Sequence, residues 1–271
     1  MAVITRIKIN NKEKGFYQVD ISETSGRTIE LNLHEDVLVH EALRKGLALS
    51  GDRLRRLLAE SEGIRAYHAA LRYLAFRMRS VREMRDYLKK KDYSAAQIAF
   101  AVGRLKKEKL LDDRSFAVSF IRTRIRTSTK GPQLIYRELL RAGVAGELAQ
   151  QTEALFPEDV QLEHARKYLA KQTASVKNKK SALEARQVLA RRLMQRGYSR
   201  TISDRVIAEI DGFLKENEKR ALIAEGERSM QKFKKSSGAE FIRKVKSNLY
   251  RKGFPPEAII AFVEERTSGR D

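Results

Sequence analysis

The chain has 271 residues, and 42% of them are hydrophobic, which is enough for a real core and excludes wholesale disorder. Lys and Arg number 56 against 35 Asp and Glu, and the resulting charge of +21 favours a polyanionic partner such as nucleic acid. The absence of cysteine excludes a disulfide scaffold, a thiolate metal site and a cysteine nucleophile. No apolar run approaches the roughly 18 residues of a spanning helix, and the first residues lack a signal-peptide pattern. We therefore expect a cytoplasmic protein with no membrane partner.

Residues 1–62 predict a small α+β module with a short antiparallel sheet. Alternating apolar and polar residues, separated by turn residues, predict three half-buried strands over 3–9, 16–21 and 28–33. A sheet this small needs cover on its apolar face, and the helical segments 35–45 and 51–61 can supply it. The module has 10 basic and 10 acidic residues, so we expect it to serve packing or partner contact.

Four segments after residue 62 share one pattern at the end of a predicted helix. Each has a leucine, three mostly polar residues, a glycine or aspartate, and a hydrophobic residue; they begin at Leu88, Leu139, Leu193 and Leu249. A left-handed Gly or Asp ends a helix, and the hydrophobic residue packs back against it. Three of the same helices begin with Ser and Glu at capping-box spacing, in the pairs Ser80–Glu83, Ser181–Glu184 and Ser237–Glu240. Gly131-Pro132 takes that place in the second segment.

This repetition predicts a mainly α protein, an elongated array of tandem three-helix repeats behind the module. The expected repeats span 63–110, 111–160, 161–214 and 215–271. The prolines fall where helices would begin, at Pro132, Pro157, Pro255 and Pro256. The positive charge is uneven, because the first repeat has 13 basic and 4 acidic residues whereas the second has 7 of each. Basic residues on solvated helix faces would also produce such patches.

Two blocks of the second repeat resemble the RecX family of bacterial RecA regulators. They are Leu-Asp-Asp-Arg-Ser-Phe-Ala-Val-Ser-Phe-Ile-Arg at 111–122 and Lys-Gly-Pro-Gln-Leu-Ile-Tyr-Arg-Glu-Leu at 130–139. The resemblance covers about 63–271, and the N-terminal module with a fourth repeat is similar to the longer RecX proteins.

The resemblance implies a non-enzymatic regulator of homologous recombination, DNA repair and the SOS response. It implies binding to the RecA–single-stranded DNA filament, with reduced ATP hydrolysis and strand exchange, and binding to DNA itself, single-stranded and also double-stranded. We expect a monomer that needs no cofactor.

Three groups of basic residues are the candidates for contact with DNA or RecA. They are Lys89, Lys90, Lys91, Arg104, Lys106, Lys107 and Lys109; Arg122, Arg124, Arg126 and Lys130; and Lys177, Lys179 and Lys180. The first group is flanked by Tyr87 and Tyr93, which could stack bases or belong to the core. The alternating arginines of the second group fan over a helix end, where they could bind phosphates or simply complement the helix dipole. Arg191, Arg192 and Arg196 extend the third group.

No pattern in the chain predicts catalysis. We interpret Asp112-Asp113 as a helix N-cap rather than a metal site, because no histidine or third carboxylate follows at ligand spacing. The histidines, His34, His40, His68 and His164, show no ligand spacing either, and we interpret them as structural. Two other functions remain open: a sequence-specific transcription factor with helix-turn-helix-like repeats, and a nuclease, which would need a metal or nucleophile constellation that the pattern lacks.

Overall fold

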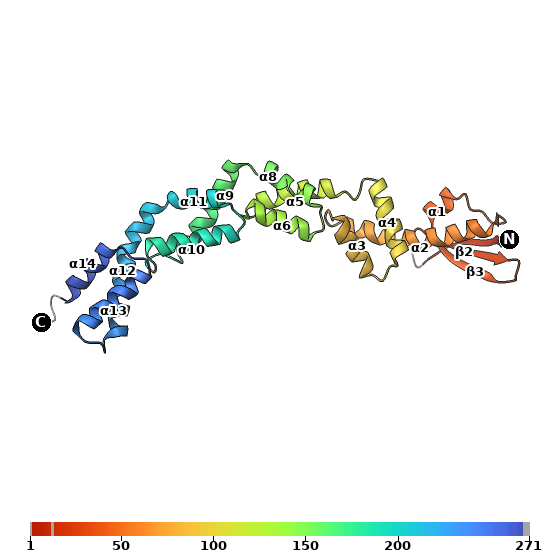
Figure 1. The fold of residues 1–271 in the computed structure, drawn as a ribbon. Coiled ribbons are helices and arrows are strands. Elements are labelled where there is room, and N and C mark those ends of the chain that lie inside the picture. Colours follow the sequence, from red (N-terminus) through yellow and green to blue (C-terminus); the bar gives the residue numbers. More distant parts are fainter. Residues whose placement is uncertain (1, 12–13, 268–271) are drawn as a thin grey trace. The chain divides into compact units, whose positions relative to one another are not determined.

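The computed structural model describes residues 2–11 and 14–267 (Figure 1). The chain folds into two compact units. The first consists of Met1–Ala117 with Arg141–Leu148, and the second of Val118–Leu140 with Ala149–Asp271.

The first unit begins with a four-stranded antiparallel sheet of order β3-β2-β1-β4. Its strands are β1 (Ala2–Ile9), β2 (Phe16–Glu23), β3 (Thr28–His34) and β4 (Ala48–Leu49). Ile4, Val19, Ile21 and Leu33 point into the core with no exposed surface, as the alternating pattern requires. The predicted three-stranded meander is confirmed. The two-residue strand β4, which pairs with Ala2 and Val3 of β1, is too short to show alternation and was not predicted.

Helices α1 (Glu35–His40) and α2 (Gly51–Leu74) accompany the sheet, and α2 packs on the sheet core through Leu54 and Leu57. The expected helix 35–45 ends early, because Ala42 adopts a positive φ of 47°. The expected break near residue 62 is wrong, since α2 runs without interruption for 24 residues. Gly63 does not end the helix: it leaves room for the Phe100 ring, which would lie 2.5 Å from a Cβ at that position. The module and the first repeat therefore share one helix.

The remaining helices fall into groups of three, which confirms the predicted tandem repeats. They are α3 (Val81–Lys89), α4 (Ala95–Lys107), α5 (Asp113–Thr127), α6 (Pro132–Arg141), α7 (Gly146–Ala149), α8 (Gln151–Leu155), α9 (Glu158–Thr173), α10 (Ala182–Gln195), α11 (Arg200–Ala208), α12 (Asp211–Phe233), α13 (Gly238–Arg251) and α14 (Pro256–Thr267). The end of α2 with α3 and α4 makes the first group, and α7 and α8 together form the third helix of the second. The expected limit between residues 214 and 215 falls inside α12. The division of the chain into five segments stays a prediction.

The predicted capping boxes are only partly present. Ser80 forms the complete box with Glu83 at the start of α3. Ser181 accepts the hydrogen bond from the Glu184 N–H, but the Glu184 carboxylate pairs with Lys180 instead of returning to the cap. Ser237 makes no side-chain cap, and the corresponding glutamate pairs with a lysine four residues on. In both cases a nearby lysine forms an ion pair with the glutamate, whose carboxylate in a complete box would accept from the backbone N–H of the cap residue.

Neighbouring repeats meet where the second helix of one begins and the second helix of the next ends. The buried Ser80 hydroxyl donates to the carbonyl of Ala142 at 2.5 Å, and the buried Ser181 hydroxyl donates to that of Lys252 at 2.6 Å. Carboxylates of the following repeat complete both junctions. The amide of Val81 donates to Asp113 at 2.9 Å, and that of Ala182 donates to Glu218 at 2.8 Å.

The junction between α6 and the turn after α10 uses backbone in place of a serine. The Gly131 N–H donates to the Arg196 carbonyl at 2.9 Å. A Cβ on Gly131 would lie 2.5 Å from the backbone of Gly197, so only glycine fits this approach. Pro132 follows at the first helical position and has no N–H, so it needs no carboxylate from the next repeat. Gly131-Pro132 therefore forms this junction through the backbone, without the serine hydroxyl that the other two junctions use.

Candidate binding surfaces

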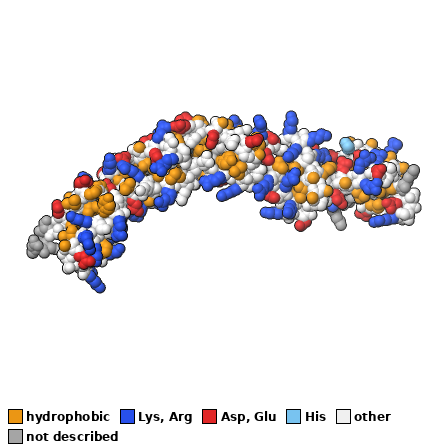
Figure 2. Space-filling model, viewed as in Figure 1, with side chains coloured by type: hydrophobic (Ala, Val, Ile, Leu, Met, Phe, Trp, Pro, Cys, Tyr) orange, Lys and Arg blue, Asp and Glu red, His pale blue; other side chains and the backbone are white. Residues whose placement is uncertain are grey.

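The predicted basic residues divide into exposed cations and cations that hold the fold together. The exposed ones form no ion pair with any residue in the described ranges: Lys89, Lys90, Lys91, Lys106, Lys107, Lys109, Arg122, Arg126, Lys177 and Lys179. Arg104, Arg124, Lys130 and Lys180 have carboxylate partners. In the surface view, Lys and Arg side chains occur over both units, with acidic side chains between them (Figure 2).

The first basic group lies mainly at two helix C-termini. Lys89, Lys90 and Lys91 end α3 and begin its turn, and the cluster near Lys106 ends α4. Cations at these ends complement the helix dipoles and project into solvent. The group therefore keeps its exposed positive charge, apart from Arg104.

Arg104 belongs to a polar network that joins α4 to the module. Its Nε lies 2.9 Å from Glu108, its terminal nitrogen lies 3.5 Å from Asp36, and its guanidinium sits 4.4 Å above the Tyr67 ring. Tyr67 donates to Glu108 at 2.5 Å. Burial, together with this hydrogen bond, raises the pKa of Tyr67 to about 12. Arg104 thus serves structure rather than an open surface.

The tyrosines beside this group are also committed to packing. Tyr87 stacks on Tyr73 with ring centroids 3.9 Å apart, and Arg79 covers the Tyr73 ring at 3.8 Å. Tyr93 is half-buried against the core of the first repeat. One face of the Tyr87 ring is therefore covered by Tyr73, and the core interpretation of Tyr93 is confirmed.

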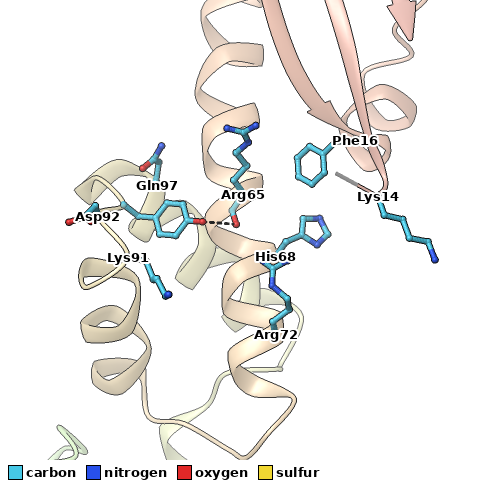
Figure 3. Close-up of a pocket in the computed structure, with 9 residues that line it drawn as sticks. Lys14, Phe16, Arg65, His68, Arg72, Lys91, Asp92 and Gln97 are labelled. Atoms are coloured by element: carbon cyan, nitrogen blue, oxygen red, sulfur yellow. Dashed lines mark hydrogen bonds between the residues drawn. The ribbon is translucent and has the colours of Figure 1, made fainter. Parts of the chain in front are cut away.

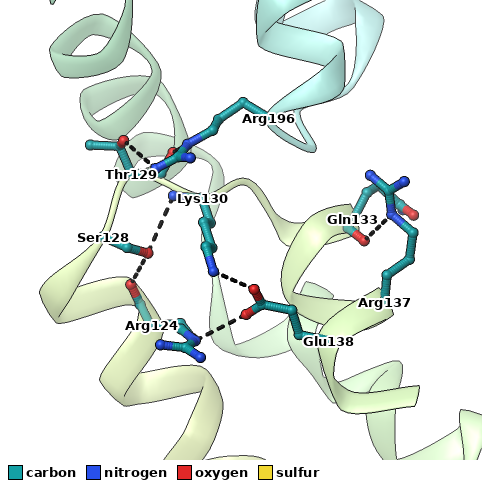
Figure 4. Close-up of polar contacts among 8 residues, drawn as sticks. All are labelled: Arg124, Ser128, Thr129, Lys130, Gln133, Arg137, Glu138 and Arg196. Atoms are coloured by element: carbon teal, nitrogen blue, oxygen red, sulfur yellow. Dashed lines mark hydrogen bonds and ion pairs between the residues drawn. The ribbon is translucent and has the colours of Figure 1, made fainter. Parts of the chain in front are cut away.

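The second basic group separates into two pairs, and Figure 4 shows the pair that contacts Glu138, namely Arg124 and Lys130. Arg124 contacts Glu138 of α6 at 2.9 Å and sits over the Phe120 ring, and Lys130 pairs with the same carboxylate. Arg122 and Arg126 are exposed and, being four residues apart, lie on one face of the helix. The four predicted residues therefore do not fan out together. Arg124 and Lys130 form a clasp on Glu138, whereas Arg122 and Arg126 are exposed to solvent.

Arg196 joins the clasp region from the following repeat. Its Nε donates to the Thr129 carbonyl at 3.1 Å (Figure 4). Tyr198 donates to the same oxygen at 2.9 Å. The segment between α5 and α6 is thus held from both sides, and Arg196 is not an open cation.

The third basic group borders a cleft of about 500 Å³ in the second unit. Lys179 and Lys180 lie there beside cations that the sequence did not indicate, namely Arg228, Arg251 and Lys252. Glu225 accepts from Arg228 at 2.9 Å and pairs with Lys252, while Lys180 pairs with Glu184. These extra cations come from the fourth repeat. The shared turn pattern at Leu249 was a signal for Arg251 and Lys252, once the docking of one repeat on the next is known, whereas nothing in the pattern indicated Arg228.

A larger cleft, of about 690 Å³, lies in the first unit (Figure 3). Its cations are Lys14, Arg65, Arg72 and Lys91, and its other lining residues are Phe16, His68, Asp92, Tyr93 and Gln97. Among the four cations, only Lys91 was a candidate from the sequence. The other three were missed because they belong to the neutral module and to the partly buried helix α2.

The Asp112 carboxylate caps α5, as predicted. It accepts from the Ser115 N–H at 2.8 Å and more weakly from Arg114 at 3.4 Å. The hydrogen bond from Ser115 lowers the pKa of Asp112. Asp113 serves the neighbouring helix α3 through its contact with Val81.

The fold brings His34, Asp36 and His68 together, although their spacing in the chain gave no sign of it. Their candidate ligand atoms all lie within 4.8 Å of one another. His34 caps α1 by accepting from the Asp36 N–H at 3.2 Å, and Asp36 is shared with Arg104. Burial, and then the neighbouring His34, lower the pKa of His68, which favours a neutral ring. A second such cluster, at His40, Glu41 and Glu60, is more exposed.

Within the described residues, no helix combines the length and the apolar character needed to cross a membrane. Two family models match this chain: the first three-helix domain of RecX over residues 66–105 and the second over 112–152. The first range includes Lys89, Lys90, Lys91 and Arg104, and the second includes Arg122, Arg124, Arg126 and Lys130.

Curated relatives and solved structures match over longer stretches. A regulatory protein RecX from Halalkalibacterium halodurans is 36% identical over 98% of this chain and 100% of its own length. One from a Geobacillus strain is 33% identical over 99% of each chain. A crystal structure of a regulatory protein RecX superposes with a TM-score of 0.66 at 25% identity, over 76% of this chain and 98% of that one. A RecX structure from Lactobacillus salivarius has a TM-score of 0.50 at 27% identity, over 56% and 98%. The chain belongs to the RecX family of regulatory proteins.

Proposed function

We propose that the protein regulates RecA by binding the RecA–single-stranded DNA filament and lowering its ATP hydrolysis and strand exchange. It does so as a cytoplasmic monomer, by binding alone, in homologous recombination and DNA repair. The observation that carries this proposal is the set of exposed cations on successive repeats of a RecX-family chain, which have no acidic partner among the residues that the structure describes.

These cations suit a filament that combines DNA with protein. Exposed lysines and arginines attract phosphates over a distance and release counterions on contact. In the α5 group, the clasp on Glu138 holds the helix in place, so that Arg122 and Arg126 project from a fixed support. A regulator that contacts more than one filament subunit would hold neighbours at one spacing and so oppose the changes that ATP turnover requires.

The test is RecA's single-stranded-DNA-dependent ATPase, titrated with this protein at low salt. We expect inhibition well below one protein per RecA. The double variant Arg122→Gln, Arg126→Gln should inhibit about tenfold less strongly, because it removes two outward charges from one helix face. A matched control is Lys171→Gln with Arg220→Gln, which removes two exposed charges outside the three basic groups.

No inhibition by the wild-type protein at saturation would overturn the proposed function. Equal losses in the two double variants would remove α5 from the interface. Circular dichroism melting of each variant separates loss of binding from loss of fold.

A further inference from the structure

The cleft in the first unit is lined by three segments that lie far apart in the chain. Lys14 comes from the turn before β2, Phe16 is the first residue of β2, and Lys91 comes from the turn after α3 (Figure 3). Arg65, His68 and Arg72 come from α2, where spacings of three and four residues place them on one face. The cleft therefore exists only when the module and the first repeat pack together on the same helix.

The charge inside the cleft is strongly one-sided. Its lining contains four cations and one acid, Asp92. In the part of the chain that the structure describes, Lys14, Arg72 and Lys91 form no ion pair. The like charges of these three cations repel one another, so an anion in the cleft would be bound favourably.

The adjoining histidine cluster does not turn this cleft into a metal site. Asp36 is already shared with the Arg104 guanidinium at 3.5 Å, and the His34 nitrogen accepts the α1 cap hydrogen bond. Arg72 and Arg104 also add positive potential at His68. A cation would meet this field, whereas a phosphate would be attracted by it.

The form of the cleft favours a flexible strand over a duplex or a peptide. Double-stranded DNA is stiff over roughly 150 base pairs and does not bend into a cleft of this size. A peptide would need apolar surface for an anchoring side chain, but Phe16 is only 8% exposed. A basic groove that follows a flexible backbone is the usual site for single-stranded nucleic acid.

We propose that this cleft binds the phosphate backbone of single-stranded nucleic acid, with the N-terminal module as one wall. The inference deepens the proposed function and rests on it for the biological source of the strand. Arg65, Arg72, Lys14 and Lys91 contact phosphates, and Gln97 offers a further hydrogen-bond donor. The module therefore has a direct role in binding, although its own net charge is zero.

The experiment measures binding of a fluorescein-labelled oligothymidylate to the full chain by anisotropy, without RecA, at several salt concentrations. The test variant is Arg72→Gln with Lys91→Gln. The control is Arg27→Gln with Lys45→Gln, which removes two exposed charges from the same unit outside the cleft. Arg27 follows the far end of β2, roughly 25 Å from Phe16 at about 3.3 Å per strand residue.

We expect the test variant to bind about 20-fold more weakly near 0.1 M salt. Two lost phosphate contacts should reduce the slope of log K against log salt by about 1.4, since each contributes about 0.7 for single strands. The control should keep the wild-type slope. Equal behaviour of the two variants would overturn the proposal, as would an absence of oligothymidylate binding by the wild-type protein.

Two further measurements exclude other occupants. If thymidine monophosphate competes as well as the oligonucleotide, the cleft is a mononucleotide site and the strand proposal is wrong. If the test variant keeps its oligonucleotide affinity but loses inhibition of the RecA ATPase, the cleft faces protein, and the proposal is again wrong. A variant that loses strand binding while the wild-type protein inhibits RecA supports the cleft proposal and leaves the proposed function standing. If the wild-type protein does not inhibit RecA but binds the strand through the cleft, only the proposed function fails.

Discussion

The two basic clefts are built around equivalent turns of the repeat but differ in their counter-charges. In the first unit, Lys91-Asp92-Tyr93 borders the cleft, and in the second unit Lys252-Gly253-Phe254 does. Lys252 pairs with the buried carboxylate of Glu225, whereas Lys91 forms no ion pair with a described residue. The number of cations in a cleft is thus a poor guide to its affinity for anions, because carboxylates from other helices, such as Glu225 of α12, decide how many of them remain available.

The largest expected effect follows from removing the Glu225 carboxylate, whose ion pairs make the second cleft differ in charge from the first. Glu225→Gln keeps the side-chain volume but withdraws the partner of Arg228 and Lys252. We expect the free energy of unfolding to fall by about 2 kcal/mol, because two charge-assisted contacts at a buried group are lost. Oligothymidylate affinity should rise by about fivefold for each freed cation that reaches a phosphate. Urea unfolding and anisotropy measure the two effects, and unchanged affinity would show that this cleft does not receive nucleic acid.

Substitutions at the equivalent turn positions 253 and 92 should change the unfolding free energy less, and in opposite directions. Gly253 has φ +78° and Asp92 has φ 61°, so both are left-handed. Gly253→Ala should lower the unfolding free energy by about 1–2 kcal/mol, because a Cβ is disfavoured there. Asp92→Gly relieves the same strain and should raise stability by up to about 1 kcal/mol. It also removes the single acid lining the first cleft, so strand binding should tighten. Chemical denaturation with anisotropy checks both, and weaker binding by Asp92→Gly would contradict the charge argument.

The smallest expected effect is a pH dependence at the edge of the first cleft. Burial first, and then His34, Arg72 and Arg104, hold the pKa of His68 below its usual value, while Asp36 acts in the opposite direction. The folded state therefore favours the neutral ring, and its contribution to stability is present above the ordinary histidine pKa of about 6.5 and lost as the pH falls. The stability difference between wild type and His68→Gln should shrink as the pH is lowered from about 7.5 to 5.5, measured by denaturant unfolding. A difference that is constant over this range would contradict the buried, neutral assignment.

Local patterns in the sequence predicted the main elements of the fold. Alternation at Ile7 and Ile9 indicated the first strand, and the recurring leucine at 88, 139, 193 and 249 indicated the repeat, because both patterns reflect short-range rules of strand pleating and helix termination. The break near residue 62 was predicted wrongly for a related reason. A glycine can signal a helix end or a close contact, and only the position of Phe100 shows that Gly63 serves a contact.

The candidate site was less predictable than the fold. The sequence identifies Lys91 and Lys130 as cations of equal local appearance, yet Lys130 pairs with Glu138 and Lys91 lines an open cleft. Lys14 and Arg72 gave no signal, because they lie 58 residues apart on different elements.

By itself, the sequence determined the helical repeats, the small sheet, the high positive charge and the resemblance to the RecX family, since each is written in spacing or composition. The tertiary structure decided which charges are cancelled and which converge. Ion pairing depends on contacts over a few ångströms between side chains of different helices and turns, and no local pattern encodes which carboxylate will meet which lysine.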